Sequence, residues 1–205
     1  MVSVKEEKIG KMKIFGIYDI SEVKVQDQGL KAYINLEPKI LVKSHGRERD
    51  RFGRTKINVI ERLINKVAVP GHRGRKHKII TRVSGKYTQH AKVILEVFRI
   101  IQEKTKQNPI QVLVTAIENS APRDEITTIE YGGARYPQAV DCAPQRRIDM
   151  ALRNIVHGSF DKSFGKKAKL VETLAQEIMK AAENSQDSFA VKKRVEIEKQ
   201  SDSAR

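Results

Sequence analysis

The chain has 205 residues, of which 39% are hydrophobic, 5% are aromatic and none is tryptophan, so a modest core can form. Its 40 lysines and arginines against 25 aspartates and glutamates give a formal net charge of +15, which favours a polyanionic partner, nucleic acid before an anionic membrane. One cysteine excludes an internal disulfide and no apolar run approaches the ~20 residues that span a bilayer, so we expect a soluble cytosolic protein without a membrane partner.

The first quarter of the chain lacks a decisive hydrophobic period. Residues 14–18 and 23–25 could form two short strands, because they carry aromatic and β-branched side chains. Residues 43–54 read KSHGRERDRFGR, a charged segment broken by two glycines, which is typical of a linker. We therefore predict a boundary near residue 50, with an N-terminal extension and basic linker at 1–53 and a helical domain at 54–205.

Apolar residues recur at helical spacing in six later segments, which predicts six helices. The third of them has Asn108 as its expected N-cap and Pro109 at its first position, and Gly158 is expected to end the fourth. The sixth is poor in apolar residues and is expected to be a docked or frayed end. The expected helices cover about 55–67, 88–105, 109 onward, 144–158, 166–183 and 188–199.

A β-hairpin is predicted at about 125–143, where two segments rich in β-branched and aromatic residues flank Gly132-Gly133. A two-residue hairpin turn needs positive φ at its central positions, which glycine reaches without a Cβ clash. Arg135 and Tyr136 follow the turn on what should be an exposed ribbon that suits RNA. The predicted fold is mainly α: a six-helix bundle with one protruding β-hairpin arm and an N-terminal extension.

Positive charge is concentrated in two blocks. Residues 44–99 hold 15 basic and four acidic side chains, and residues 132–169 hold eight and three. Two separated basic blocks indicate a composite nucleic-acid face, whose side chains neutralise phosphates and release counterions. Ordinary solvated loops and helix faces would carry similar residues. The candidate contacts are Arg47, Arg49, Arg51, Arg54, Lys56, Arg73, Arg75, Lys76 and Lys78 in the first block, and Arg146, Arg147 and Arg153 in the second.

Residues for catalysis or metal binding are not found. His72 and His77 form a single pair where a structural zinc site needs four ligands, so a cationic loop is the better interpretation, and Cys142 is most simply a packing residue. The motifs G-x-S-x-G and H-E-x-x-H are absent, and the G-x-x-G at 71–74 lacks the strands of a KH domain. We expect no enzyme, no metal and no cofactor.

Four ordered motifs together resemble the universal small-subunit ribosomal protein seven family, called protein five in eukaryotic numbering. They are INVIERLINKV, EKTKQNPIQVLVTAIENSAPR, YGGARYPQAVDCAPQRRIDMALRNIV and FAVKKR, and they cover about 58–194. The N-terminal stretch IFGIYDISEVKVQDQGLKAYI is similar to the archaeal and eukaryotic branch. The loop at 68–86 is longer and more basic than in bacterial members, and residues 1–50 have no bacterial counterpart.

The resemblance implies a cytoplasmic protein in the head of the small ribosomal subunit. It implies binding to the 3′ major domain of small-subunit ribosomal RNA, nucleation of head assembly, and an arm at the exit site. The arm's implied neighbours are exit-site transfer RNA, messenger RNA, other head proteins and platform protein eleven. Carried over by motif, Lys86, Arg146, Arg147, Arg153, Lys192, Lys193 and Arg194 would face ribosomal RNA, and Gly132, Gly133, Ala134, Arg135 and Tyr136 would form the tip. The alternative is a free-standing RNA-binding regulator, including one that binds its own messenger.

Overall fold

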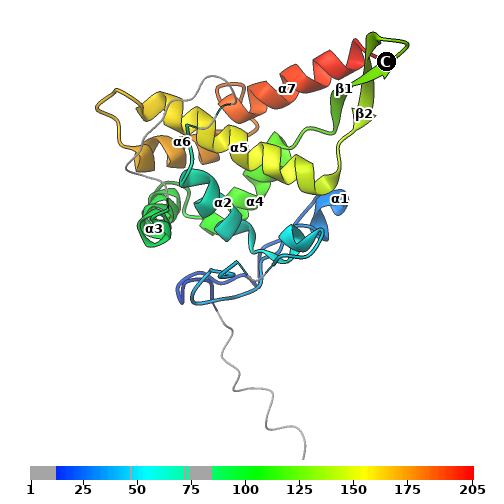
Figure 1. The fold of residues 1–205 in the computed structure, drawn as a ribbon. Coiled ribbons are helices and arrows are strands. Elements are labelled where there is room, and N and C mark those ends of the chain that lie inside the picture. Colours follow the sequence, from blue (N-terminus) through cyan, green and yellow to red (C-terminus); the bar gives the residue numbers. More distant parts are fainter. Residues whose placement is uncertain (1–12, 47, 72, 74–84) are drawn as a thin grey trace, which may run out of the picture.

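The structure is a computed structural model that describes residues 13–46, 48–71, 73 and 85–205. It is a helical bundle from which a two-stranded antiparallel hairpin projects, as Figure 1 shows, and the predicted fold class is confirmed. No helix within these ranges is long and apolar enough to cross a membrane. The elements are α1 (Gln28–Lys31), a 3₁₀ turn (Gly53–Lys56), α2 (Val59–Val67), α3 (Tyr87–Thr105), α4 (Pro109–Ser120), β1 (Asp124–Tyr131), β2 (Ala134–Asp141), α5 (Pro144–Ser163), α6 (Leu170–Ala182) and α7 (Phe189–Asp202).

Local capping chemistry fixes where several helices begin. The Asn108 side chain accepts a hydrogen bond of 3.1 Å from the backbone N–H of Ile110, and Pro109 occupies the first turn of α4. The predicted start of this helix is therefore confirmed. Asn58 caps α2 in the same way, and Ser188 caps α7. Each cap satisfies a backbone donor that has no partner inside its helix.

The predicted end of the fourth helix at Gly158 is wrong, because α5 continues to Ser163. A Cβ at position 158 would lie 2.6 Å from Cβ of Phe189 and 3.2 Å from Cδ of Glu177, so glycine is needed for close packing against α6 and α7. Glycine in a helix interior costs about 1 kcal/mol relative to alanine. Tight packing with two neighbouring helices offsets that cost.

The N-terminal residues share the core of the helices. Ile14, Leu30 and Val42 are buried in the same hydrophobic cluster as side chains of α2 to α7. The two strands expected at 14–18 and 23–25 are wrong. Residues 14 and 18 form only an isolated bridge around a turn, because Phe15 and Gly16 both have positive φ, and residues 23–25 have no regular structure.

The hairpin extends from the end of the bundle where α4 stops and α5 begins. All eight residue pairs of β1 and β2 are in register from Asp124 opposite Asp141 to Tyr131 opposite Ala134. Helix α7 packs beside the base of both strands (Figure 1), so the last helix is docked rather than frayed.

Candidate nucleic-acid interface

The tip of the arm has the turn that its sequence predicts. Gly132 and Gly133 have φ values of 60° and 82° and form the two-residue connection between Tyr131 and Ala134. Positive φ at both positions matches the right-handed twist of the strands, and glycine supplies it without strain.

The outer arm has an uncharged face and a face with one ion pair. Residues directly opposite each other share a face, so Ile129, Tyr131 and Tyr136 lie together, with 46%, 81% and 58% of their surfaces exposed. On the other face, the guanidinium of Arg135 lies 3.6 Å from the carboxylate of Glu130. The predicted tip cation is therefore already paired within the arm.

The base of the arm is tied to α5 by an ion pair. Nε of Arg146 lies 2.6 Å from Glu125 Oε1, and this arginine side chain keeps 57% of its surface exposed. The backbone N–H of Cys142 donates to the carbonyl of Arg123 at 2.8 Å, which closes the base of the hairpin.

The thiol of Cys142 is buried and stays protonated. Burial, and then the charge of Glu125, raise its pKa to about 12, so this cysteine is a packing residue.

Arg147 points into the protein, unlike its neighbour in sequence. Its Nη2 donates to Asp27 at 2.8 Å, its Nε donates to the carbonyl of Pro122 at 3.1 Å, and 11% of the side chain is exposed. Burial alone would raise the pKa of Asp27, but the hydrogen bond and charge of Arg147 lower it overall. Arg147 thus joins the N-terminal segment to the start of α5 and to Pro122, two residues before the arm.

A groove of 540 Å³ brings the two basic blocks together. It lies between residues 48–54 and the first half of α5. Arg49 and Arg54 line it from the first block, and Arg146 and Arg153 line it from the second. Arg49, Arg54 and Arg153 are exposed, so their guanidinium groups are accessible from solvent. Arginines of the two basic blocks therefore line one groove, and nucleic-acid binding by this face stays a prediction.

Asp149 is surrounded by several cations at this groove. Arg54 Nη1 lies 3.1 Å from Asp149 Oδ2, and Arg62 Nη2 lies 3.3 Å from Oδ1. Burial lowers the pKa of Lys66, Asp149 raises it, and the charges of Arg153, Arg54 and Arg62 lower it, with a net decrease. A local excess of positive charge therefore remains beside the groove.

Arg62 and Lys66 were missed by sequence reasoning. Both lie on α2, whose apolar spacing suggests a core helix, and Arg62 is buried with 6% of its surface exposed. Its Nε and Nη1 have no hydrogen-bond partner among the described residues. Arg62 and Lys66 are four residues apart on one helix and therefore share a face, and this spacing was the signal in the sequence that could have indicated them.

The remaining candidates of the first block lie in different settings. Arg51 is exposed with its guanidinium 5.2 Å from the Phe52 ring, and Lys56 lies 4.0 Å from Asp50. Lys86 is exposed immediately before α3. Arg47, Arg75, Lys76 and Lys78 fall outside the described residues, as do His72 and His77.

Arg73 packs against α5 instead of standing free. Its Nη1 lies 2.7 Å from Asp161 Oδ2, and its Nη2 donates to the carbonyl of His157 at 2.9 Å. Burial, reinforced by the charges of Arg73 and Arg153, lowers the pKa of His157 to about 4. His157 is therefore neutral at physiological pH.

The basic cluster of α7 is divided between surface and interior. Lys192 is exposed, and Lys193 pairs with Glu196 at 2.6 Å. Arg194 points inward and donates to the carbonyl of Asn119 at 2.8 Å. Within the part of the chain that the structure describes, no three His, Cys, Asp or Glu side chains are grouped to hold a metal ion.

Comparison with known proteins gives one consistent family. The family model for ribosomal protein S7p/S5e matches residues 30–205. Small ribosomal subunit protein uS7 of Nanoarchaeum equitans is 51% identical over 197 residues, covering 95% of this chain and 100% of that protein. The proteins of the same name from Archaeoglobus fulgidus and Picrophilus torridus are each 45% identical over 193 residues, covering 94% of this chain and 94% and 98% of their own lengths. The chain therefore belongs to the ribosomal protein S7p/S5e family.

Proposed function

We propose that this protein binds the 3′ major domain of small-subunit ribosomal RNA, nucleates assembly of the head, and holds its arm at the exit site. Its membership of the family makes it a structural component of the small ribosomal subunit and not an enzyme. In this proposal the arm lies near exit-site transfer RNA, messenger RNA and platform protein eleven, and the ribosome is in the cytoplasm.

The groove between residues 48–54 and α5 is the observation that carries the RNA-binding proposal. Arg49, Arg54, Arg146 and Arg153 converge there from two blocks that are almost a hundred residues apart in sequence. The acidic side chains that line the same groove are Glu48, Asp50 and Asp149. Lys66 and Arg62 add positive charge behind Asp149, so a phosphate backbone would find a favourable potential there.

In this proposal the groove makes the phosphate contacts, and the arm makes contacts that do not depend on charge. Residues 126–139 contain one acidic and one basic side chain, Glu130 and Arg135, which pair with each other. Counterion release from phosphates therefore contributes little at the arm. Its exposed Tyr131, Tyr136 and Ile129 suit base stacking or apolar contacts with a neighbouring protein.

The RNA proposal is tested with a fragment of the 3′ major domain and the salt dependence of its dissociation constant. Arg49→Ala and Arg153→Ala should each weaken binding and reduce the slope of log K against log salt by about 1. Arg99→Ala is the matched control, because Arg99 is an exposed arginine of α3 that pairs with Glu103 and lies outside the groove. Slopes equal to that of Arg99→Ala would refute the groove as a phosphate-binding surface.

Arg146 and Arg147 are expected to separate in the same assay. Arg146→Ala should reduce the salt slope, because its guanidinium is more than half exposed at the groove. Arg147→Ala should instead lower the free energy of unfolding, because it removes the buried partner of Asp27. Sedimentation of the tagged protein with small subunits tests the ribosomal role, and a mostly ribosome-free pool would favour the free-standing regulator.

A further inference from the structure

Helix α7 connects the interior of the bundle to the base of the arm. It begins beside α5 and α6, and its C-terminal end lies next to β1 and β2 (Figure 1). Each end of the helix is held by a different set of polar contacts, and neither set belongs to the groove at residues 48–54.

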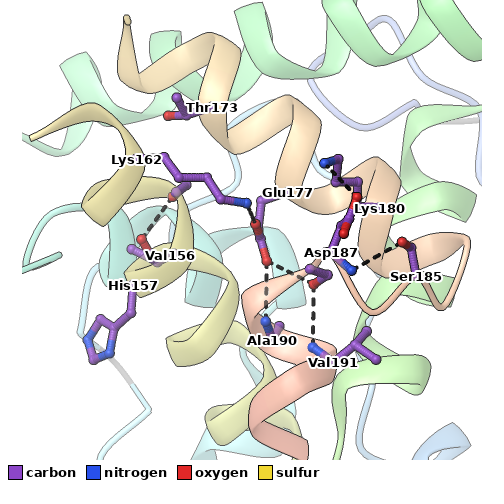
Figure 2. A network of polar contacts seen from close by, with 12 residues as sticks. Val156, His157, Lys162, Thr173, Glu177, Lys180, Ser185, Asp187, Ala190 and Val191 are labelled. Atoms are coloured by element: carbon purple, nitrogen blue, oxygen red, sulfur yellow. Dashed lines mark hydrogen bonds and ion pairs between the residues drawn. The ribbon is translucent and has the colours of Figure 1, made fainter. Parts of the chain in front are cut away.

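The N-terminal end of α7 is fixed by the buried carboxylate of Glu177 on α6. Oε1 of this residue accepts hydrogen bonds from Ser188 Oγ at 2.8 Å and from the backbone N–H of Ala190 at 3.2 Å. Oε2 lies 2.5 Å from the Lys162 ammonium of α5, and Figure 2 shows these helices converging on the carboxylate. A negative charge at a helix N-terminus is favourable, and here it is fully buried and fully bonded.

The C-terminal end of α7 holds the first residues of the arm. Glu198 Oε1 accepts a hydrogen bond of 3.1 Å from the backbone N–H of Arg123, directly before β1. Arg205, just beyond the helix, places Nη2 2.6 Å from Asp124 Oδ2 at the start of β1. Between the two ends, Arg194 donates to the C-terminal turn of α4 through the carbonyl of Asn119.

The arm itself cannot fix its own direction. An isolated two-stranded hairpin is marginally stable in water, and the outer residues of both strands are exposed on both faces. Its orientation therefore depends on contacts at the base, where α7 meets β1 on one side and Arg146 of α5 meets Glu125 on the other.

We propose that α7 acts as a strut that sets the direction of the arm relative to the bundle. Glu177 fixes the helix in the body, and Glu198 with Arg205 transmits that position to β1. This role concerns the free protein and goes beyond the proposed function, because it holds whichever partner the arm meets.

The test measures the distance between the arm and the body by electron paramagnetic resonance of two spin labels. The labels are placed at the exposed positions Thr128→Cys on β1 and Gln176→Cys on α6, in a full-length Cys142→Ala background. The strut is weakened by Glu198→Ala with Arg205→Ala. The matched control is Arg99→Ala with Glu103→Ala, which also removes one acidic and one basic side chain, from an exposed pair on α3.

The strut variant should give a broader distance distribution than its parent, whereas the control should not. Amide hydrogen exchange in β1 and β2 should keep the parent's rates in both variants, because the hairpin ladder is intact and only its direction is released. An unchanged distribution, or equal broadening in the control, would overturn the proposal. Loss of exchange protection within the hairpin would also overturn it, because α7 would then support folding of the arm and not its direction.

Discussion

Replacing Glu177 separates the charge of this carboxylate from its role as a hydrogen-bond acceptor. Glu177→Ala removes the acceptor for Ser188 Oγ and for the Ala190 backbone N–H, both of which are buried. Glu177→Gln keeps an oxygen that can accept both bonds, and it removes the negative charge that faces Lys162 and the N-terminus of α7.

The two substitutions should therefore differ strongly in cost. A buried donor without a partner costs about 1–3 kcal/mol, so Glu177→Ala should lower the free energy of unfolding by ~3–5 kcal/mol once the cavity is included. The Lys162 side chain is 38% exposed, and its ammonium can turn to solvent when the carboxylate is gone. Glu177→Gln should consequently cost only about 1 kcal/mol.

Urea unfolding of the full-length free protein, followed by far-ultraviolet circular dichroism, measures both values. The m-values should equal that of the parent, because the surface exposed on unfolding does not change. If Glu177→Gln were as costly as Glu177→Ala, the ion pair with Lys162 would dominate and the capping argument would be refuted. Lys162→Met supplies the complementary measurement, since it removes the cation and retains both α7 hydrogen bonds.

Three further outcomes follow from packing, titration and turn geometry. Gly158→Ala should overpack the core, which costs about 1–3 kcal/mol, and should therefore lower the melting temperature. Adding Phe189→Ala should not restore the melting temperature, because the clash is with the Cβ atom that alanine retains at position 189. The pKa of His157 is about 4 in the folded state against its usual 6.5, so its contribution to stability is complete above about pH 6.5 and is lost as pH falls toward 4. Between pH 6.5 and pH 4, the urea midpoint of His157→Gln should therefore fall less than that of the parent protein. Gly133→Val should destabilise the hairpin by ~1–2 kcal/mol, because valine is strained at positive φ, and amide exchange in the hairpin should become faster. Gly132→Asn should be tolerated, because asparagine adopts positive φ more readily than other residues with a side chain.

Features that depend on neighbouring residues were predictable from the sequence. The start of α4 at Asn108 and Pro109, and the Gly132-Gly133 turn, need only capping and turn chemistry within a few residues. Gly158 was misjudged because its need for a small side chain comes from helices that follow much later in the chain.

Residues of the site whose setting depends on distant parts of the chain were likewise not predictable. Arg146 and Arg147 have the same local signal, yet Arg147 is drawn inward by Asp27, which lies 120 residues earlier. No periodic pattern could identify that pairing. Charge counting located both basic blocks, but only the packing of residues 48–54 against α5 determined which arginines line one groove.

The paired charges of the outer arm have a consequence for the order of events during association. A basic body is accelerated toward a polyanion over distances of about a Debye length, whereas a segment without net charge experiences little of that attraction. In this chain the excess charge lies outside residues 126–139, where Glu130 and Arg135 cancel. The body should therefore contact the polyanion first, and the arm should dock afterwards. Raising the salt concentration should slow docking of the body and leave the later docking of the arm almost unaffected.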